Sequence, residues 1–322
     1  MNQPANALPA PLKYKLDKRL RLLSPSDIVT LHKCPRKRQL QRLWPERIWD
    51  ASIDTAFGKM FGEGVQQILA HQLDFESLMI KAALEWDVDI QEPEKDGKSF
   101  TRCWNALVHY ARTVQDSDLA NYEVVMYNGK PACELAFSIK LPYGYYYRGK
   151  IDLVLQHRIS GKYLVVDIKT TGARYTNPAK FQNSAQVLGY SIIMDKIAPG
   201  LQSFECLYYE YLSSTRKWES HPFQLDYLDR AMWIRDLMID VNILEFVYAD
   251  LDEWPKHGEA CAGYGMKSCQ FLQHCTMQTE NLVDVSLFDY DTDAMDIEGE
   301  RDKWEIHVTL DELINAQQQS IR

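Results

Sequence analysis

Two periodicities of apolar residues follow one another along the 322-residue chain. In the N-terminal third, apolar side chains recur at helical spacing, which predicts a helix from Ser24 through Arg38. A hydroxyl followed by proline and an acidic residue is typical of a helix start, which supports Ser24 as the cap. A second helix is expected over 57–72, and further helices over 75–115 around a polar loop at 91–99.

The spacing then changes to that of strands. Four segments alternate or run apolar and carry β-branched and aromatic residues: 134–141, 145–155, 162–169 and 205–212. Helical spacing returns over 177–195 and again over 225–247. This order predicts an α/β fold in which one mixed central sheet is flanked by helices, with helical elaboration before it.

Composition narrows the class of protein. The chain is 46% apolar and 25% charged with a net charge of −9, which is ordinary for a globular protein. No apolar run is long enough for a membrane helix, and the N-terminus does not resemble a secretion signal. Seven cysteines, an odd number, argue against a secreted disulfide scaffold. We therefore expect a soluble cytoplasmic protein with no membrane partner.

Charge is unevenly distributed along the chain. Residues 13–47 carry eleven basic side chains and three acidic ones, whereas 281–314 carries eleven acidic and two basic. The basic segment could neutralise phosphates, although a solvated face is the plainer interpretation of a charge run alone. The basic residues expected to contact DNA are Lys33, Arg36, Lys37, Arg38 and Arg42.

Three regions are expected from these patterns. Residues 1–22 are predicted to form a flexible basic arm, and residues 23–280 the main domain. Residues 281–322 are predicted to form an acidic C-terminal tail that could compete with DNA or dock a partner protein, with a solvated tail as the plainer alternative.

The most informative stretches are Gly149-Lys150-Ile151-Asp152 and Val165-Val166-Asp167-Ile168-Lys169-Thr170. Because strand side chains alternate, Asp167 and Lys169 share one face. If 158–161 forms a hairpin loop, Asp152 lies opposite Asp167 with side chains about 5 Å apart. A register shift of two residues would pair Asp152 with Lys169 instead. Either register gathers two carboxylates and one lysine on one patch.

Two facing carboxylates repel each other unless a cation lies between them. A hard divalent cation such as Mg2+ or Mn2+ would suit Asp152 and Asp167, and the carbonyl of Ile168 could add a ligand. Lys169 could then position an attacking water or stabilise charge on a phosphate. Asp-x-Lys taken alone is more often a surface salt-bridge cluster.

Together these residues resemble a known family. Asp152, followed by Asp167-Ile168-Lys169, resembles the PD-(D/E)XK nuclease signature, and Gln186 with Tyr190 resembles the Q-x-x-x-Y motif of its RecB-type branch. The resemblance spans roughly 24–275 and implies a restriction-endonuclease-like core. It implies that the catalytic residues are Asp152, Asp167, Lys169, Gln186 and Tyr190. Glu134 stands where members often carry an upstream glutamate.

One motif departs from that pattern. RecB-type nucleases often have G-x-x-x-H with a metal-binding histidine, and here Gly62 is followed by Gln66 in the histidine position. An amide is a weaker ligand than imidazole. We therefore expect the metal to be held by Asp152 and Asp167, with Glu63 or Gln66 assisting through water.

Four cysteines form a second candidate site. One N-terminal cysteine and a C-terminal trio resemble the iron–sulfur nucleases of the RecB-type group, including the AddB subunit; the four are Cys34, Cys261, Cys269 and Cys275. Four thiolates suit a [4Fe–4S] cluster. The alternative is Zn2+ on the same cysteines, or with His32, His257 or His274 replacing one of them. Cys103, Cys133 and Cys206 lie in apolar settings and are expected in the core.

The resemblance implies a metal-dependent deoxyribonuclease, an exonuclease acting on DNA ends or single strands in DNA processing, recombination or repair, including phage-type processing. The chain has no G-x-x-x-x-G-K-[ST] motif and thus no sign of a helicase. A non-catalytic DNA- or protein-binding module is the alternative from another class. RNA as substrate, cleavage polarity and strand preference stay open at this level.

Overall fold

A computed structural model describes residues 18–43, 52–70, 74–86, 93–182, 184–199, 201, 204–251, 253–261, 268–272, 275 and 306–312. The α-helices are α1 (Pro25–Lys33), α2 (Pro35–Leu43), α3 (Ile53–Ala70), α4 (Phe75–Glu85), α5 (Phe100–Thr113), α6 (Ala179–Gln182), α7 (Ala185–Ile197) and α8 (Tyr227–Ile243). The strands are β1 (Leu22–Leu23), β2 (Tyr122–Val124), β3 (Met126–Tyr127), β4 (Lys130–Pro131), β5 (Cys133–Lys140), β6 (Tyr146–His157), β7 (Tyr163–Thr171), β8 (Phe204–Leu212), β9 (Lys217–Leu225) and β10 (Ile306–Thr309).

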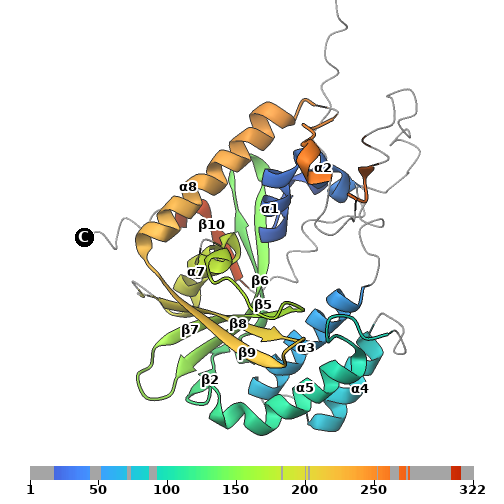
Figure 1. The fold of residues 1–322 in the computed structure, drawn as a ribbon. Helices are drawn as coiled ribbons and strands as arrows, with labels where there is room; N and C mark the ends of the chain where they lie inside the picture. The colour runs from blue at the N-terminus through green and yellow to red at the C-terminus, as the bar shows by residue number, and fades with distance from the viewer. Residues whose placement is uncertain are drawn as a thin grey trace, which may run out of the picture. The chain divides into compact units, whose positions relative to one another are not determined.

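Most strands belong to one mixed sheet. Its order is β10-β5-β6-β7-β8-β9 (Figure 1). β1 and β2 also pair with β6. β7 and β8 run parallel, as do β10 and β5, whereas β6 and β7 and then β8 and β9 are antiparallel. The predicted mixed central sheet with flanking helices is therefore confirmed. The sequence did not predict β2, β9 or β10.

The chain divides into two compact units. The first includes described residues within 1–48, 141–147 and 235–296, and the second those within 49–140, 148–234 and 297–322. The second unit carries most of the sheet and all the predicted catalytic residues.

Alternation along β7 gives the sheet of the second unit two different faces. Leu164, Val166 and Ile168 join a large apolar core with residues of α3 and α5, and α4 packs on α3 (Figure 1). Asp167 and Lys169 point to the opposite face, toward α7. There Tyr190 contacts Asp167 and Gln186 contacts Lys169. One face is therefore apolar core, and the other carries residues predicted to be catalytic.

The first unit is built around α1 and α2 and a buried arginine. Ser24 caps α1 as predicted, since its hydroxyl accepts from the Asp27 amide at 3.2 Å. The predicted continuous helix to Arg38 is wrong: α1 ends at Lys33, Cys34 is extended, and α2 begins at Pro35. A residue before proline is sterically kept out of the helical region, which explains the break.

The C-terminal boundary also differs from the predicted one. Residues 306–309 form β10, which pairs in parallel with β5 from Ile306 opposite Phe137 to Thr309 opposite Lys140. This part of the predicted acidic tail therefore belongs to the sheet of the second unit. The acidic stretch 281–305 and most of the predicted arm, 1–17, lie outside the described residues. Among the described helices, none is both long and apolar enough to cross a bilayer.

Candidate active site

The hairpin of β6 and β7 has the register that places the two aspartates opposite each other. Leu153 pairs with Val166 and Leu155 with Leu164, and the His157 amide donates to the Lys162 carbonyl at 2.8 Å. The hairpin loop is thus 158–161, and the alternative pairing of Asp152 with Lys169 is wrong. The predicted direct register is confirmed.

The ladder between these strands ends at the aspartates. Beyond the Leu153–Val166 pair, the Ile168 amide donates to Oδ2 of Asp152 at 2.9 Å. A side-chain oxygen has taken the place of a strand carbonyl, which leaves a break in the pairing where Asp152 and Asp167 meet. The sheet therefore opens locally at the two carboxylates, and the Ile168 amide keeps a hydrogen-bond acceptor there.

Lys169, Gln186 and Tyr190 form a closed chain of contacts with Asp167. Nζ of Lys169 lies 2.6 Å from Oδ2 of Asp167 and donates to Oε1 of Gln186 at 3.2 Å. Nε2 of Gln186 donates to the Tyr190 hydroxyl at 2.5 Å, and that hydroxyl donates to Oδ1 of Asp167 at 3.4 Å. Because Gln186 and Tyr190 are four residues apart on α7, one helical face holds both ends of the chain.

Burial makes it costly in free energy to keep both carboxylates of this site charged. Asp167 is 0% exposed. Burial and then the Asp167 charge raise the pKa of Asp152 well above its usual range, against the lowering effect of Lys169. Burial also raises the pKa of Asp167, although Lys169 and the Tyr190 hydroxyl act to lower it. Burial alone would lower the pKa of Lys169, but Asp167 and Asp152 outweigh it, and the pKa is raised.

A third carboxylate, that of Glu134, belongs to the same neighbourhood. Its charge raises the pKa of both Asp152 and Asp167, and it lies 3.7 Å from Nζ of Lys150. Glu134 has φ of 50°, a left-handed conformation that costs a side-chain-bearing residue about 1 kcal/mol. Strain of this kind clusters at functional sites.

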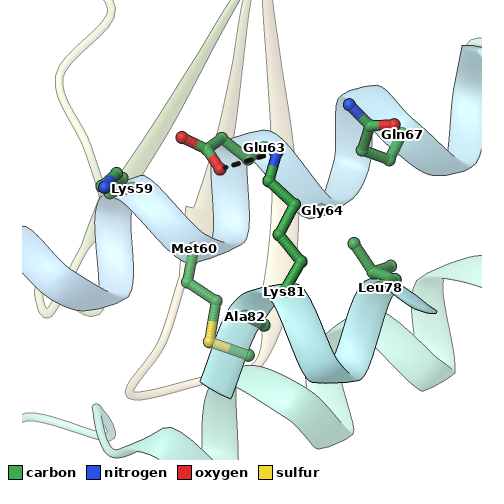
Figure 2. A pocket seen from close by; sticks show the side chains of 8 residues that line it. All are labelled: Lys59, Met60, Glu63, Gly64, Gln67, Leu78, Lys81 and Ala82. Atoms are coloured by element: carbon green, nitrogen blue, oxygen red, sulfur yellow. Dashed lines mark ion pairs between the residues drawn. The ribbon is translucent and has the colours of Figure 1, made fainter. Parts of the chain in front are cut away.

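Gln66 lies in this neighbourhood, and Glu63 is engaged elsewhere. Nε2 of Gln66 is buried and donates to Oε1 of Glu134 at 2.8 Å. Glu63 instead lines a hollow between α3 and α4 and pairs with Lys81 at 3.6 Å (Figure 2). Of the two side chains expected to assist a metal, Gln66 therefore contacts the carboxylate cluster and Glu63 contacts α4.

The donors at this site suit a hard cation. The two aspartates are oxygen ligands whose mutual repulsion and burial disfavour the charged forms, so a cation between them would relieve the cost. Within the described ranges, no three or more His, Cys, Asp or Glu side chains are grouped closely enough to hold a metal by themselves. A cation here would therefore need backbone or water oxygens in addition to Asp152 and Asp167.

The four predicted cluster cysteines lie in the first unit. Cys34 is buried at the break between α1 and α2, and the Cys269 amide donates to the Cys261 carbonyl at 2.9 Å. Burial raises the pKa of Cys275; Arg36 and Lys256 lower it, whereas Cys269 and Cys34 raise it further. These cysteines are free thiols and, like the rest of the described chain, form no metal-binding group as placed.

The predicted DNA-binding arginines have structural partners instead. Arg38 is fully buried, donates to the carbonyls of Leu20 and Leu22 at 2.7 and 3.0 Å, and lies over Trp254. Arg36 is buried and pairs with Glu253 at 3.0 Å. The prediction is corrected for these two, because neither guanidinium is accessible to a phosphate.

The other three members of that set remain at the surface to different degrees. Lys33 is exposed and Lys37 half-buried. Arg42 is half-buried, and its Nε donates to Asp27 at 2.9 Å.

Sequence reasoning missed a buried polar cluster beside Lys169. Glu210 is the neighbour of Lys169 across β7 and β8, is 1% exposed, and contributes to raising the pKa of Lys169. Its Oε2 lies 3.4 Å from Nε2 of His221 on β9. Nothing in the local sequence marks these residues, because only the register of three strands brings them together.

Comparison with known proteins identifies the class. The family model for the PD-(D/E)XK nuclease superfamily matches residues 22–276, and the chain belongs to that superfamily. The crystal structure of a "Putative exonuclease" from Eubacterium rectale is 10% identical, with a TM-score of 0.49, over 88% of this chain and 99% of that one. The crystal structure of SSO0001 is 15% identical, with a TM-score of 0.36, over 80% and 86%. The search of curated proteins finds no match.

Proposed function

We propose that this member of the nuclease superfamily is a divalent-metal-dependent deoxyribonuclease that acts on DNA ends or single strands. The observation that carries the proposal is the facing pair of half-buried Asp152 and fully buried Asp167, with Lys169 held against Asp167. A binding module gains nothing from two facing carboxylates of which one is fully buried, because this arrangement costs stability. A phosphodiester hydrolase uses such a pair to bind a cation.

Asp152 and Asp167, with the carbonyl of Ile168, would hold Mg2+ or Mn2+. When bound, the cation would polarise a phosphodiester oxygen and lower the pKa of a coordinated water. Lys169 places an ammonium beside Asp167, where it can stabilise negative charge that develops on the phosphate. Gln186 accepts from Lys169 and fixes its direction, and Tyr190 orients Asp167.

We also propose an exonuclease mode and a role in DNA processing, recombination or repair, on the strength of the RecB-type motif formed by Gln186 and Tyr190. These two side chains contact Lys169 and Asp167 directly, as a functional reading of the motif requires. The acidic tail as a docking site for a partner protein remains a proposal, since 281–305 lies outside the described residues.

For the cysteines, we propose that Cys34, Cys261, Cys269 and Cys275 ligate a [4Fe–4S] cluster of structural role, with Zn2+ as the alternative. Support comes from the electrostatic influence of Cys34 and Cys269 on Cys275 and from the hydrogen bond between Cys269 and Cys261. Burial raises the pKa of Cys275, and Arg36 and Lys256 act against this rise, toward the thiolate that binds metal. The nuclease residues lie in the other unit, so the cluster would hold structure rather than take part in hydrolysis.

The test is digestion of DNA labelled at the 5′ or the 3′ end, as single strands, duplexes and closed circles, with Mg2+ or Mn2+. We expect cleavage of linear DNA that starts at an end and requires the metal. Asp167→Asn should abolish cleavage and retain binding, whereas Glu63→Gln, a matched carboxylate change outside the cluster, should cut like the wild type. Binding in EDTA without cleavage in either metal would favour the binding module. Cleavage of closed circles would overturn the exonuclease mode.

A further inference from the structure

The segment that joins β7 to α6, residues 172–178, has an exposed centre and begins three residues after Lys169. It leaves β7 shortly after Lys169 and leads through α6 to Gln186, so it connects two elements that carry the proposed catalytic residues. Ala173, Arg174 and Tyr175 are all exposed, and Tyr175 is 80% exposed. A large aromatic ring beside a cation on one loop is the composition of a nucleic-acid contact.

The N-terminal end of this loop is fixed by close packing. Oγ of Ser214 donates to the Gly172 carbonyl at 2.6 Å, and Oγ of Ser213 donates to the Asp96 carbonyl at 2.7 Å. A Cβ at Gly172 would lie 2.6 Å from Cβ of Asp96, so only glycine allows this approach. The strand therefore enters the loop in one defined direction.

The C-terminal end is fixed by the buried polar cluster that the sequence did not reveal. Oγ1 of Thr176 donates to Oε2 of Glu219 at 2.7 Å and lies 3.0 Å from Nε2 of His221. His221 is 8% exposed, and its Nε2 also lies within 3.4 Å of the buried Glu210 carboxylate. The His221 ring packs against Phe181 of α6 with centroids 5.2 Å apart. Thr176 thus joins the loop to a cluster that continues toward Lys169.

Buried carboxylates and imidazoles lower stability unless their polar contacts repay the desolvation. Here Glu219 and His221 both contact the Thr176 hydroxyl, and Ser214 holds the Gly172 carbonyl. Arg174 and Tyr175 therefore lie between two anchored ends of the loop. A fixed loop with an exposed ring loses little conformational entropy when it binds a ligand.

We infer that the loop 172–178 is a single-strand-binding element of the active site, in which Tyr175 stacks on an unpaired base and Arg174 contacts a phosphate. The inference rests on the proposed nuclease function and adds a substrate preference to it. A base in a duplex is covered by its neighbours, whereas a single strand or a frayed end offers a free face. The preferred substrate is therefore single-stranded DNA or a frayed end.

The test uses the full chain and measures binding of a short labelled single strand and of the matched blunt duplex, with Ca2+ in place of Mg2+. Tyr175→Ala should weaken single-strand binding about tenfold, the order expected when one stacked base is lost. Tyr175→Phe keeps the ring and should bind within about twofold of the wild type. Arg174→Gln should weaken binding and lower its dependence on salt.

Ile159→Ala is the matched control, since Ile159 is 87% exposed at the opposite end of β7. Equal binding by Tyr175→Ala and Ile159→Ala, or an equal loss on single strand and duplex, would overturn the inference. The two proposals fail separately. Protein that cuts DNA in Mg2+ and is indifferent to Tyr175 keeps the nuclease and loses the loop's role. If the protein needs Tyr175 to bind single strands but cuts no DNA, the loop's role is kept and the nuclease function is rejected.

Discussion

The carboxylate cluster and the cysteine quartet are assembled in different ways. Asp152, Asp167 and Lys169 come from one hairpin, and its hydrogen-bonding register alone makes them neighbours. The cysteines come from a helix break near the N-terminus and from the described residues of 261–275. Among those described residues, a backbone hydrogen bond joins two of the cysteines, from the Cys269 amide to the Cys261 carbonyl. In the carboxylate cluster, the sheet holds the side chains in place before any ligand binds.

That difference has a physical consequence for what a metal would contribute. A preformed cluster of buried charge is destabilising by itself, so a cation would relieve repulsion that already exists. A set of separate thiols gains its order from the metal, and the binding free energy becomes folding free energy. Changes in the carboxylate cluster should therefore lower activity, and changes in the cysteine quartet should lower stability.

The largest expected effect is on cleavage. Asp152→Ala, Asp167→Ala and Lys169→Ala should each lower the cleavage rate by about a thousandfold, because removal of electrostatic groups at a reacting centre costs this order. Calorimetric titration with Mg2+ should show weaker metal binding for the two aspartate variants. Folding, followed by circular dichroism, should persist in all three. Near-wild-type cleavage by Asp167→Ala would show that the hairpin is not the active site.

The cysteine region should respond in stability and colour. Anaerobically prepared protein should be brown, with broad absorbance near about 400 nm and close to four irons per chain. Cys34→Ala, Cys261→Ala, Cys269→Ala and Cys275→Ala should bleach it and lower the melting temperature. Cys103→Ala and Cys206→Ala are matched controls that should stay brown. Colourless protein with stoichiometric zinc would decide for the alternative, and full stability of all four variants would remove the site.

Arg38 separates a structural role from a DNA-binding one in the first unit. Arg38→Met should lower the free energy of unfolding by about 3–5 kcal/mol, because the carbonyls of Leu20 and Leu22 lose their donor and the buried Asp27 loses a cation. Burial lowers the pKa of Arg38 to about 10, which leaves it charged at neutral pH. Urea unfolding measures the loss.

Lys37→Ala, a change of a half-buried cation on the same helix, should alter stability by less than about 0.5 kcal/mol. If Arg38→Met leaves stability intact and weakens DNA binding instead, the original assignment of Arg38 to the DNA backbone would return.

Much of the fold could be predicted because local pattern and final position agree. The strands that became β5 to β8 alternate or run apolar, and the proposed catalytic residues lie within one hairpin and on α7. β9 was missed because polar residues and Pro222 interrupt it, which an edge strand tolerates. β10 was missed because its four residues, Ile306–Thr309, are a short strand inside a stretch whose charged residues are mostly acidic.

Burial of charge could not be predicted in either region. Arg38 looks like a phosphate ligand by composition, and only the packing of α2 shows that it faces carbonyls. Glu210 and His221 are brought beside Lys169 by the pairing of β7, β8 and β9, which join segments far apart in the sequence. The sequence predicts neighbouring residues well where their contacts are local. It fails where several strands must be aligned to bring residues together.

The smallest expected effect tests the repulsion that underlies the comparison. Burial and then the Asp167 charge hold the pKa of Asp152 above its unfolded value of about 3.9. The stability that the neutral carboxyl contributes is therefore complete below the unfolded pKa and is lost as pH rises through the folded pKa. At neutral pH the charged Asp152 opposes folding. Asp152→Asn, which keeps the shape and an acceptor for the Ile168 amide, should be more stable than the wild type in EDTA.

We expect a gain in stability near neutral pH that shrinks as pH is lowered toward the unfolded pKa of about 3.9, because the Asp152 carboxyl is then neutral in both states. Thermal unfolding of both proteins across this pH range measures it. Asp236→Asn, a change on the exposed face of α8, should show no such gap. Added Mg2+ should stabilise the wild type and leave Asp152→Asn unchanged, because the cation binds the pair that the variant has broken. If the variant is less stable at neutral pH, the aspartates are held by contacts that favour their charge, and the cluster would then be a structural ion pair like those that fix the arginines of the first unit.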